Sequence, residues 1–225
     1  KGCLMRVVVD FEGTRRVFEK PERIISCHDP ARLSCAFSEV EAALAEGFYA
    51  AGFMSYEAGY AFEEKCSSSE VESFPLLCFG CYRAPREEPP AYAAGSGFRL
   101  SDLRVNMTRD EYGQSIGAIR AHIADGDVYQ ITYCLKLHFG FSGDPRQLYS
   151  TLYSIQPVPY AAYLESEAGS ILSLSPELFL YKRGGYILTK PMKGTWPRGT
   201  CTASDAEALD AFQNDIKNRA ENVMI

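Results

Sequence analysis

The chain has 225 residues, of which 46% are hydrophobic and 23% are charged, and its formal net charge at pH 7 is −6. These values are ordinary for a globular protein, so they exclude a disordered chain, and the acidic balance argues against a nucleic-acid partner. No apolar run approaches the roughly 18 residues of a membrane span, and residues 1–10 lack a signal-peptide pattern, so we expect a cytoplasmic protein without a membrane partner.

The first part of the chain has the signals of an α+β region. We expect, in order, strand 6–9, strand 15–18, helix 38–46, strand 48–56 and strand 76–82. Serine caps helix starts and glycine follows helix ends, so the helix is predicted to open at Ser38 and to end before Gly47. The stretch 86–97 is rich in proline and glycine and is the best linker candidate. The sequence therefore predicts an N-terminal α+β region over residues 1–97 and a second region over residues 98–225.

The second region opens with a strongly marked helix. Thr108 and Glu111 have the spacing of a capping box, and Gly126 marks the helix end. The apolar residues between them repeat at helical spacing and are Tyr112, Ile116, Ile119 and Ile123. From Tyr129 to Phe141 every odd position is apolar or aromatic, which predicts one long strand with one face in a core.

The remaining elements form a helix, a series of strands and a last helix. We expect a helix capped by Asp144 with Leu148 and Leu152 inward, strands at 160–164, 170–174, 178–181 and 186–189, and a final helix from Ser204 to Val223. Gly184-Gly185 indicates a tight turn between the last two strands. The stripe of the final helix is Leu209, Phe212, Ile216, Ala220 and Val223. Because the sequence ends on the apolar run 223–225, we expect a fragment of a longer chain.

Eight cysteines are present, and without a secretion signal we expect free thiols. Cys78 and Cys81 have the C-x-x-C spacing of half a metal knuckle or a redox pair, but no second pair exists and the two lie in a strand pattern. We therefore interpret them as packing residues. The neighbours Cys27 and His28 are likewise interpreted as structural.

The two last strands bring a carboxylate close to an amine. If the hairpin turns on Gly184-Gly185, Arg183 faces Tyr186, and Glu177 falls opposite Met192, next to Lys193. Taken alone, this pattern favours an exposed ion pair beside a turn, worth under about 1 kcal/mol.

Seven strings, in order along the chain, change that interpretation. They are F-M-S-Y-E-A-G-Y-A-F-E (53–63), P-L-L-C-F-G-C-Y (75–82), D-V-Y-Q-I-T-Y (127–133), Q-P-V-P-Y-A-A-Y-L (156–164), S-L-S-P-E (173–177), P-M-K-G-T-W-P-R-G (191–199) and N-R-A-E-N-V-M-I (218–225). Together they resemble the chorismate-utilising enzymes, and most of all the aminodeoxychorismate synthase component I group. The resemblance implies an α/β (α+β) fold of large antiparallel β-sheets packed on each other with helices outside, incomplete at the C-terminus.

The resemblance also implies roles for five residues. Lys193 matches the lysine that attacks C2 of chorismate while the C4 hydroxyl leaves, a position that is alanine in anthranilate synthases. Glu177 matches the general acid that protonates this hydroxyl. Gly194 and Thr195 match the contact with the substrate carboxylate, and Glu221 matches one of the carboxylates that hold Mg²⁺. A second metal carboxylate and much of the substrate cleft belong to the part of the family that follows residue 225.

The proposed roles of the lysine and the glutamate require a suitable environment around each side chain as well as the residue types themselves. A lysine is almost wholly protonated at neutral pH, so a nucleophilic lysine needs burial or a cationic neighbour, and a glutamate needs desolvation to act as an acid. The sequence departs from the family at Thr132 and Cys134, which replace an asparagine and a threonine, and at Trp196, where arginine or leucine is common. We expect altered packing there, with function kept.

The implied reaction converts chorismate and ammonia to 4-amino-4-deoxychorismate for folate synthesis. The partner would be a glutamine amidotransferase subunit that supplies the ammonia. The alternatives are an anthranilate or isochorismate synthase of the same fold, against the first of which Lys193 argues, and a catalytically incomplete fragment that serves only as a folding or binding unit.

Overall fold

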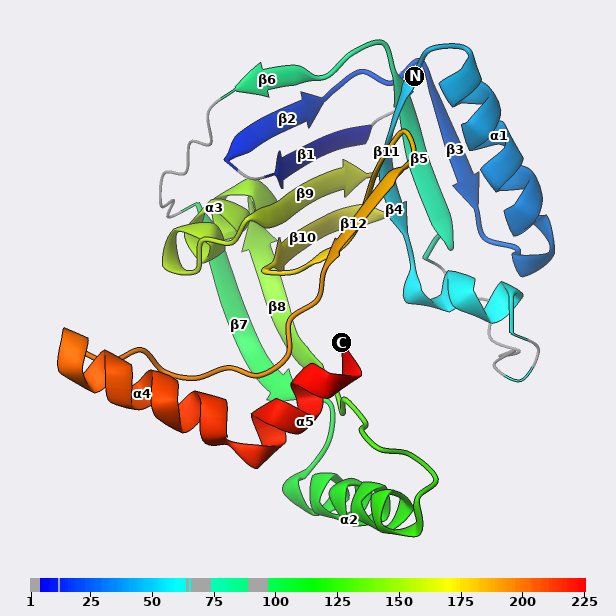
Figure 1. The fold of residues 1–225 in the computed structure, drawn as a ribbon. Coiled ribbons are helices and arrows are strands. Elements are labelled where there is room, and N and C mark those ends of the chain that lie inside the picture. Colours follow the sequence, from blue (N-terminus) through cyan, green and yellow to red (C-terminus); the bar gives the residue numbers. More distant parts are fainter. Residues whose placement is uncertain (1–4, 12, 64, 66–73, 89–96) are drawn as a thin grey trace. The chain divides into compact units, whose positions relative to one another are not determined.

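A computed structural model of the chain describes residues 5–11, 13–63, 65, 74–88 and 97–225. The chain divides into two compact units, and Figure 1 labels the helices and strands of both. The first consists of Lys1–Ala91 and Gln156–Ile225, and the second of Tyr92–Ile155. This grouping differs from the predicted boundary near residue 97, because strands that follow residue 156 pair with the strand at the start of the chain. Most of the predicted linker, residues 89–96, lies outside the described residues.

A five-stranded antiparallel sheet unites the two ends of the first unit. Its order is β10 (Gly169–Ser175), β9 (Tyr160–Ser166), β1 (Met5–Phe11), β2 (Thr14–Phe18) and β6 (Arg86–Glu88). The predicted strands near 6–9, 15–18, 160–164 and 170–174 are confirmed, whereas β6 occupies the start of the predicted linker. Asp10 and Arg15 face each other across β1 and β2 and form a buried ion pair, with 2.9 Å between Arg15 Nε and Asp10 Oδ1.

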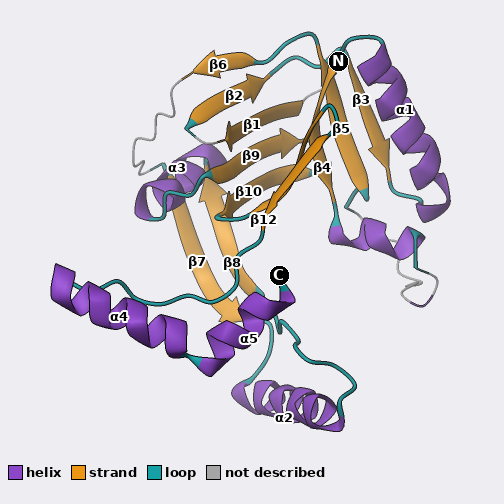
Figure 2. Cartoon of the chain, viewed as in Figure 1, coloured by secondary structure: helices purple, strands orange, loops and turns teal. Residues whose placement is uncertain are grey.

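A three-stranded antiparallel sheet carries the first helix. Its order is β3 (Arg23–Cys27), β5 (Leu77–Tyr82) and β4 (Tyr49–Met54), and α1 (Leu33–Ala45) packs against it (Figure 2). A 3₁₀ turn, Pro30–Arg32, precedes α1, and a second 3₁₀ turn, Tyr56–Ala61, follows β4. The predicted helix end is confirmed, since Gly47 has a φ of 88° just beyond it. The predicted start at Ser38 is wrong.

The helix begins early because a turn before it is already capped. The Asp29 carboxylate accepts a hydrogen bond from the Ala31 amide at 2.9 Å, which starts the 3₁₀ turn that leads into α1. Ser38 lies inside α1, where its hydroxyl donates to the Ser34 carbonyl at 3.1 Å. A serine inside a helix is followed by amides that already bond to the preceding turn, so it caps nothing and gives a misleading start signal.

Two apolar clusters form the core of the first unit. One lies between α1 and the three-stranded sheet and includes Leu33, Ala43 and Leu77. The other joins the two sheets and consists of Met5, Val7, Phe18, Ala51, Cys78, Tyr82 and Leu164. Cys78 and Cys81 are both buried in β5, so their interpretation as packing residues is confirmed. The six cysteines in the described part of the chain are free thiols.

The second unit contains a two-stranded antiparallel sheet, β7 (Phe98–Val105) with β8 (Leu137–Gly143), and two helices, α2 (Arg109–Asp125) and α3 (Pro145–Ile155). The capping box of α2 is confirmed, because the Thr108 hydroxyl accepts the Glu111 amide hydrogen at 3.3 Å and the Glu111 carboxylate accepts the Thr108 amide hydrogen at 2.7 Å. Gly126 ends the helix with a φ of 82°. The apolar repeat of α2 is not buried, and of the two residues predicted to point inward from α3, Leu148 is buried and Leu152 is exposed.

The predicted long strand 129–141 is only half formed. Residues 129–136 have no regular secondary structure, and β8 begins at Leu137. The last ladder contacts are those of Asn106, whose amide donates to the Lys136 carbonyl at 3.0 Å. A strand needs a neighbour for its backbone groups, and β7 ends at Val105. The predicted core face is wrong as well, because most of the alternating side chains are exposed, including Leu137, Phe139 and Phe141 within β8 and most of all Tyr129.

The chain closes with a hairpin and two helices of the first unit. The hairpin is β11 (Leu178–Arg183) with β12 (Tyr186–Lys190), which confirms the predicted turn at Gly184-Gly185. The predicted single last helix is wrong, because the segment forms α4 (Thr202–Asn214) and α5 (Ile216–Met224). Asp215 separates them with extended backbone angles, and its carboxylate caps α5 by accepting the Asn218 amide at 2.8 Å.

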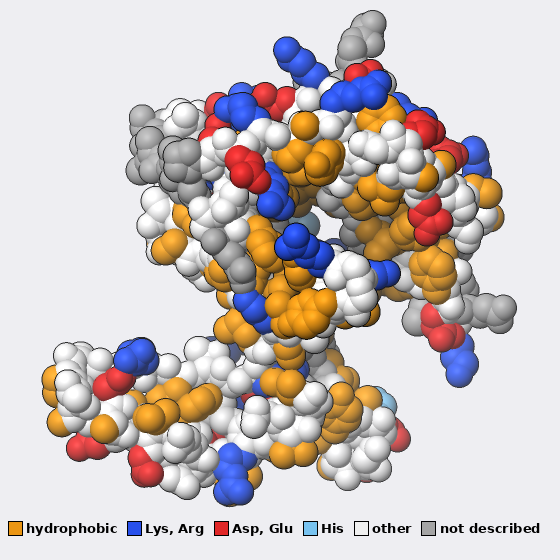
Figure 3. Space-filling view, turned by 45° about the horizontal axis from the view of Figure 1, so that its top comes forward, with side chains coloured by type: hydrophobic (Ala, Val, Ile, Leu, Met, Phe, Trp, Pro, Cys, Tyr) orange, Lys and Arg blue, Asp and Glu red, His pale blue; other side chains and the backbone are white. Residues whose placement is uncertain are grey.

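The predicted core stripe of this last segment is uncovered. No residue of α4 or α5 is buried, and Leu209, Ile216 and Val223 are 55%, 84% and 86% exposed. Apolar side chains therefore reach the surface along α4 (orange in Figure 3). The fold is mixed α/β, with antiparallel sheets that share a core, so the predicted fold class is confirmed. No helix within the described ranges has the length and apolar content needed to cross a membrane.

Candidate active site

The β11–β12 hairpin holds Glu177 beside the segment that carries Lys193. The predicted register is confirmed from Arg183 opposite Tyr186 to Tyr181 opposite Leu188, but a bulge on β11 then shifts it, and Leu178 pairs with Lys190. Glu177 nevertheless reaches the expected neighbour, because its Oε1 accepts the Met192 amide hydrogen at 3.2 Å. The Ser175 hydroxyl steadies the turn by accepting the Glu177 amide at 3.2 Å and donating to its carbonyl at 2.8 Å.

Lys193 lines a cavity of about 320 Å³ together with residues of the last two helices. The other lining residues are Phe212, Gln213, Asn218, Arg219 and Asn222. The side chains of Lys193 and Glu177 are both exposed. The structure therefore brings an amine and a carboxylate to the same end of one hairpin, but this chain does not supply the burial that a nucleophilic lysine requires.

Gly194 is pressed against the last two helices. Its φ is 75°, in the left-handed region, and a Cβ atom at this position would lie 2.4 Å from Asn218 Oδ1 and 3.3 Å from a ring carbon of Phe212. Both the backbone conformation and the lack of space require glycine. Thr195 follows at the surface. The predicted contact of these two residues with a substrate carboxylate stays a prediction.

Glu221 lies half-buried on α5, one position before the cavity residue Asn222. A carboxylate is the ligand type that Mg²⁺ prefers. The described part of the chain has no group of three or more aspartate, glutamate, histidine or cysteine side chains that could hold a metal. Glu221 thus fits a magnesium site in donor type, and further donors would have to come from the substrate or from elsewhere.

The sequence did not predict a role for two further residues near this site, Arg198 and Asp205. The Asp205 carboxylate on α4 accepts hydrogen bonds from the Arg198 side chain, with 2.6 Å between Arg198 Nε and Asp205 Oδ1, and from the Gly199 amide at 2.9 Å. The Arg198 guanidinium, followed by the Gly199 amide, lowers the pKa of Asp205 to about 2. An aspartate shortly after an R-G pair, at the start of a helix, was the available signal.

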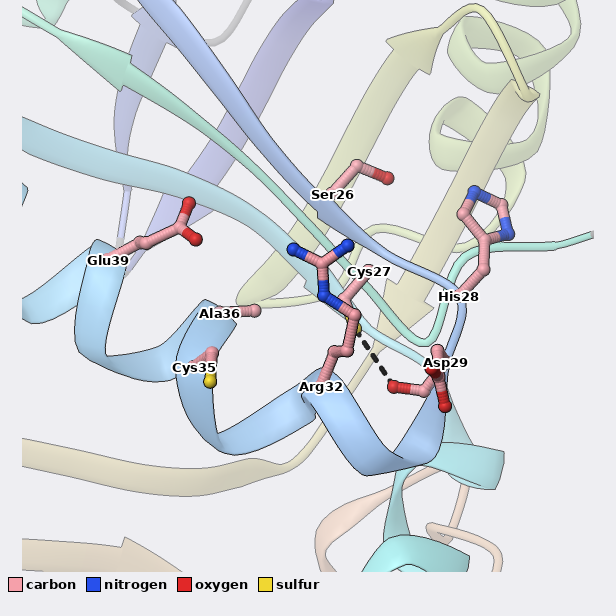
Figure 4. A pocket seen from close by; sticks show the side chains of 8 residues that line it. All are labelled: Ser26, Cys27, His28, Asp29, Arg32, Cys35, Ala36 and Glu39. Carbon is pink, nitrogen blue, oxygen red and sulfur yellow. Dashed lines mark hydrogen bonds between the residues drawn. The ribbon is translucent and has the colours of Figure 1, made fainter.

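A separate cavity of about 260 Å³ lies between the end of β3 and the start of α1 (Figure 4). Its ionisable lining residues, His28, Asp29, Arg32 and Glu39, are exposed. The Cys27 thiol donates to the Asp29 carbonyl at 3.2 Å, drawn as the dashed line. This bond within the loop supports the structural interpretation of Cys27 and His28.

Comparison with known proteins identifies the family. Residues 8–225 match the family described as chorismate binding enzyme. "Aminodeoxychorismate synthase component 1" of Escherichia coli strain K12 is 38% identical over 125 residues, which are 56% of this chain and 28% of that protein. "Anthranilate synthase component 1" of Aquifex aeolicus is 31% identical over 126 residues, 56% of this chain and 26% of that protein. The aligned part is thus under a third of the length of these relatives.

A solved structure shares the fold. It comes from Bacillus anthracis and has been assigned as an isochorismate synthase specific for 2,3-dihydroxybenzoate. The two folds align with a TM-score of 0.70 at 13% sequence identity, over 98% of this chain and 57% of that one. Because the family match extends over almost the whole chain and over all the site residues described above, this chain belongs to the chorismate binding enzyme family.

Proposed function

We propose that this chain carries one part of an active site that converts chorismate and ammonia to 4-amino-4-deoxychorismate. The observation that carries the proposal is Lys193 in P-M-K-G-T, at the hairpin end where Glu177 bonds to the adjacent amide of Met192. Four relatives with the name aminodeoxychorismate synthase component 1, at 36–38% identity, support this reaction over the alternatives.

The proposed reaction has two steps that balance. The neutral amine of Lys193 forms a bond to C2 of chorismate and gives up one proton, both double bonds of the ring diene shift, and the C4 hydroxyl takes a proton from Glu177 and leaves as water. Ammonia then bonds to C4 and gives up one proton, both double bonds shift back, and the nitrogen of Lys193 takes up a proton and is released from C2 as the neutral amine. Covalent catalysis of this kind replaces one difficult displacement by two easier ones.

Chorismate carries two carboxylates, and the remaining predicted residues would bind this charge. Gly194 would contact a substrate carboxylate through its backbone, and Thr195 would contact it through its hydroxyl. Glu221 would hold Mg²⁺, which offsets negative charge on a bound carboxylate. A glutamine amidotransferase subunit would supply the ammonia.

The 225-residue chain alone is expected to be inactive. Lys193 and Glu177 are exposed in it, and the aligned part is under a third of the length of the relatives. An exposed lysine and glutamate in water are neither a good nucleophile nor a good acid at neutral pH. We expect no 4-amino-4-deoxychorismate from this chain with chorismate, Mg²⁺ and excess ammonium; measurable turnover would contradict this view.

The decisive test uses the complete protein encoded by the same reading frame. With chorismate and Mg²⁺ but no ammonia, intact-mass spectrometry should detect a species heavier by chorismate minus water, on the peptide that contains Lys193. Lys193→Ala should abolish this adduct, and Glu177→Gln should slow its formation. Lys182→Ala removes an exposed lysine from β11 of the same hairpin and should leave the adduct unchanged.

Formation of a different product would contradict the proposed reaction. Anthranilate or isochorismate formed by the unmodified protein, without an adduct at any time point, would show that Lys193 is not a nucleophile. The corresponding alternative function would then stand.

A further inference from the structure

The segment Pro191–Gly199, called here the lysine segment, is held by a carboxylate near each end. Near its start, Glu177 accepts the Met192 amide hydrogen at 3.2 Å. At its end, Asp205 accepts both the Arg198 side chain and the Gly199 amide. Lys193, Gly194 and Thr195 lie between these two attachments. Since the segment has no regular secondary structure of its own, such attachments determine where its side chains lie.

From this arrangement we infer that Asp205 is a positioning residue for Lys193, acting through Arg198 and Gly199. The inference rests on the proposed function. Arg198 donates to both oxygens of Asp205, which is the geometry that fixes direction as well as distance. The additional bond to the Gly199 amide ties the backbone of the lysine segment to α4, whichever rotamer the arginine adopts.

The same helix also contacts the middle of the lysine segment. Phe212 of α4 lies against Gly194, and its ring centroid is 6.1 Å from that of Trp196. Helix α4 therefore contacts the segment through Asp205 at one end and through Phe212 near the lysine. A change at Asp205 would free the end of the segment and allow Gly194 to move away from Phe212 and Asn218.

The alternative is an ordinary surface ion pair, which contributes at most about 1 kcal/mol to stability and nothing to catalysis. Arg198 is highly exposed, so the pair is in contact with water. Stability measurements thus cannot separate the two views. A positioning role instead predicts a loss in the chemical step, because a small misplacement of a reacting group can lower a rate by about 100-fold.

The test compares Asp205→Ala, Asp205→Asn and Arg198→Lys in the complete encoded protein. Asp205→Ala should slow adduct formation at Lys193 and lower kcat by roughly 10- to 100-fold, with a smaller change in the KM for chorismate. Asp205→Asn keeps an acceptor for the Gly199 amide and should lose less. The exchange Arg198→Asp with Asp205→Arg should recover part of the rate. Glu87→Ala, which removes an exposed ion pair with Arg16, is the matched control and should have no effect.

A second measurement keeps the inference separate from the proposed function. Hydrogen exchange of the amides of residues 192–196, 198 and 199, without substrate, should be at least about 10-fold faster in Asp205→Ala than in the parent and in Glu87→Ala. No adduct in the parent would refute the proposed function but leave this measurement valid. Unchanged exchange, or a raised KM with unchanged kcat, would overturn the positioning role. If Asp205→Ala fails to fold, Asp205→Asn and Arg198→Lys decide by the same criteria.

Discussion

Two parts of the first unit have similar amphipathic signals and opposite outcomes. The three-stranded sheet and α1 bury Leu33, Ala43 and Leu77 almost completely. The hairpin β11–β12 with α4 and α5 leaves Ile187 and Leu209 more than half exposed. Periodicity determines which face of an element is apolar, but another element must cover that face before it contributes to a core. The candidate catalytic residues all belong to the uncovered part.

The largest contrast should come from the two kinds of ion pair. Asp10→Ala leaves the buried Arg15 without its carboxylate and should cost about 3–5 kcal/mol of unfolding free energy. Glu87→Ala removes the exposed pair with Arg16 and should cost about 0–1 kcal/mol. Urea unfolding followed by circular dichroism measures both. Equal costs would mean that the sheet around Asp10 is open to water.

Truncating one leucine in each part compares how much a buried and an exposed apolar side chain contribute to stability. Leu77→Ala, in the core under α1, should lower the free energy of unfolding by about 2–5 kcal/mol. Leu209→Ala on α4 should change it by less than about 0.5 kcal/mol, because the side chain is half in water already and alanine suits a helix. A large cost at Leu209 would show that another surface covers α4 in solution.

Thiol reactivity gives the smallest but most direct contrast. Burial raises the pKa of the Cys78 thiol, whereas the hydrogen bond with the Ser204 hydroxyl lowers the pKa of the exposed Cys201 thiol. The thiolate is the reactive form, so iodoacetamide near pH 7.5 should modify Cys201 well before Cys78. Peptide mass spectrometry over time gives the order, and denaturant should remove the difference. Early labelling of Cys78 in the folded chain would contradict the packing of β5.

Local signals in the sequence gave the elements that local contacts hold together. The capping box at Thr108 and Glu111 involves residues three apart, and the turn at Gly184-Gly185 needs only its own backbone. Both predictions are confirmed. The break between α4 and α5 at Asp215 is equally local. The Asp215 carboxylate accepts the Asn218 amide hydrogen, and an aspartate, which is a capping residue, inside a helical pattern could have indicated this break.

Signals that depend on distant partners were less informative. The alternation from Tyr129 to Phe141 is real, but a strand forms only where β7 supplies hydrogen bonds. Likewise, the motif P-M-K-G-T identified Lys193, but not that Asn218 and Phe212, about 20 residues away, leave room only for glycine at position 194. Such contacts depend on how helices pack, which a single sequence does not state.

The bulge on β11 has a consequence for which changes this gene can tolerate. Two residues, Phe179 and Leu180, stand opposite Thr189 alone, so β11 is one residue longer than regular pairing needs. Both side chains are exposed, and many substitutions there should be accepted. Loss of one codon at 179–180 would regularise the ladder, with Leu178 still opposite Lys190 on the same face and Glu177 still beside Met192. Among homologous genes, this short stretch should therefore vary in letters and also tolerate shortening by one residue.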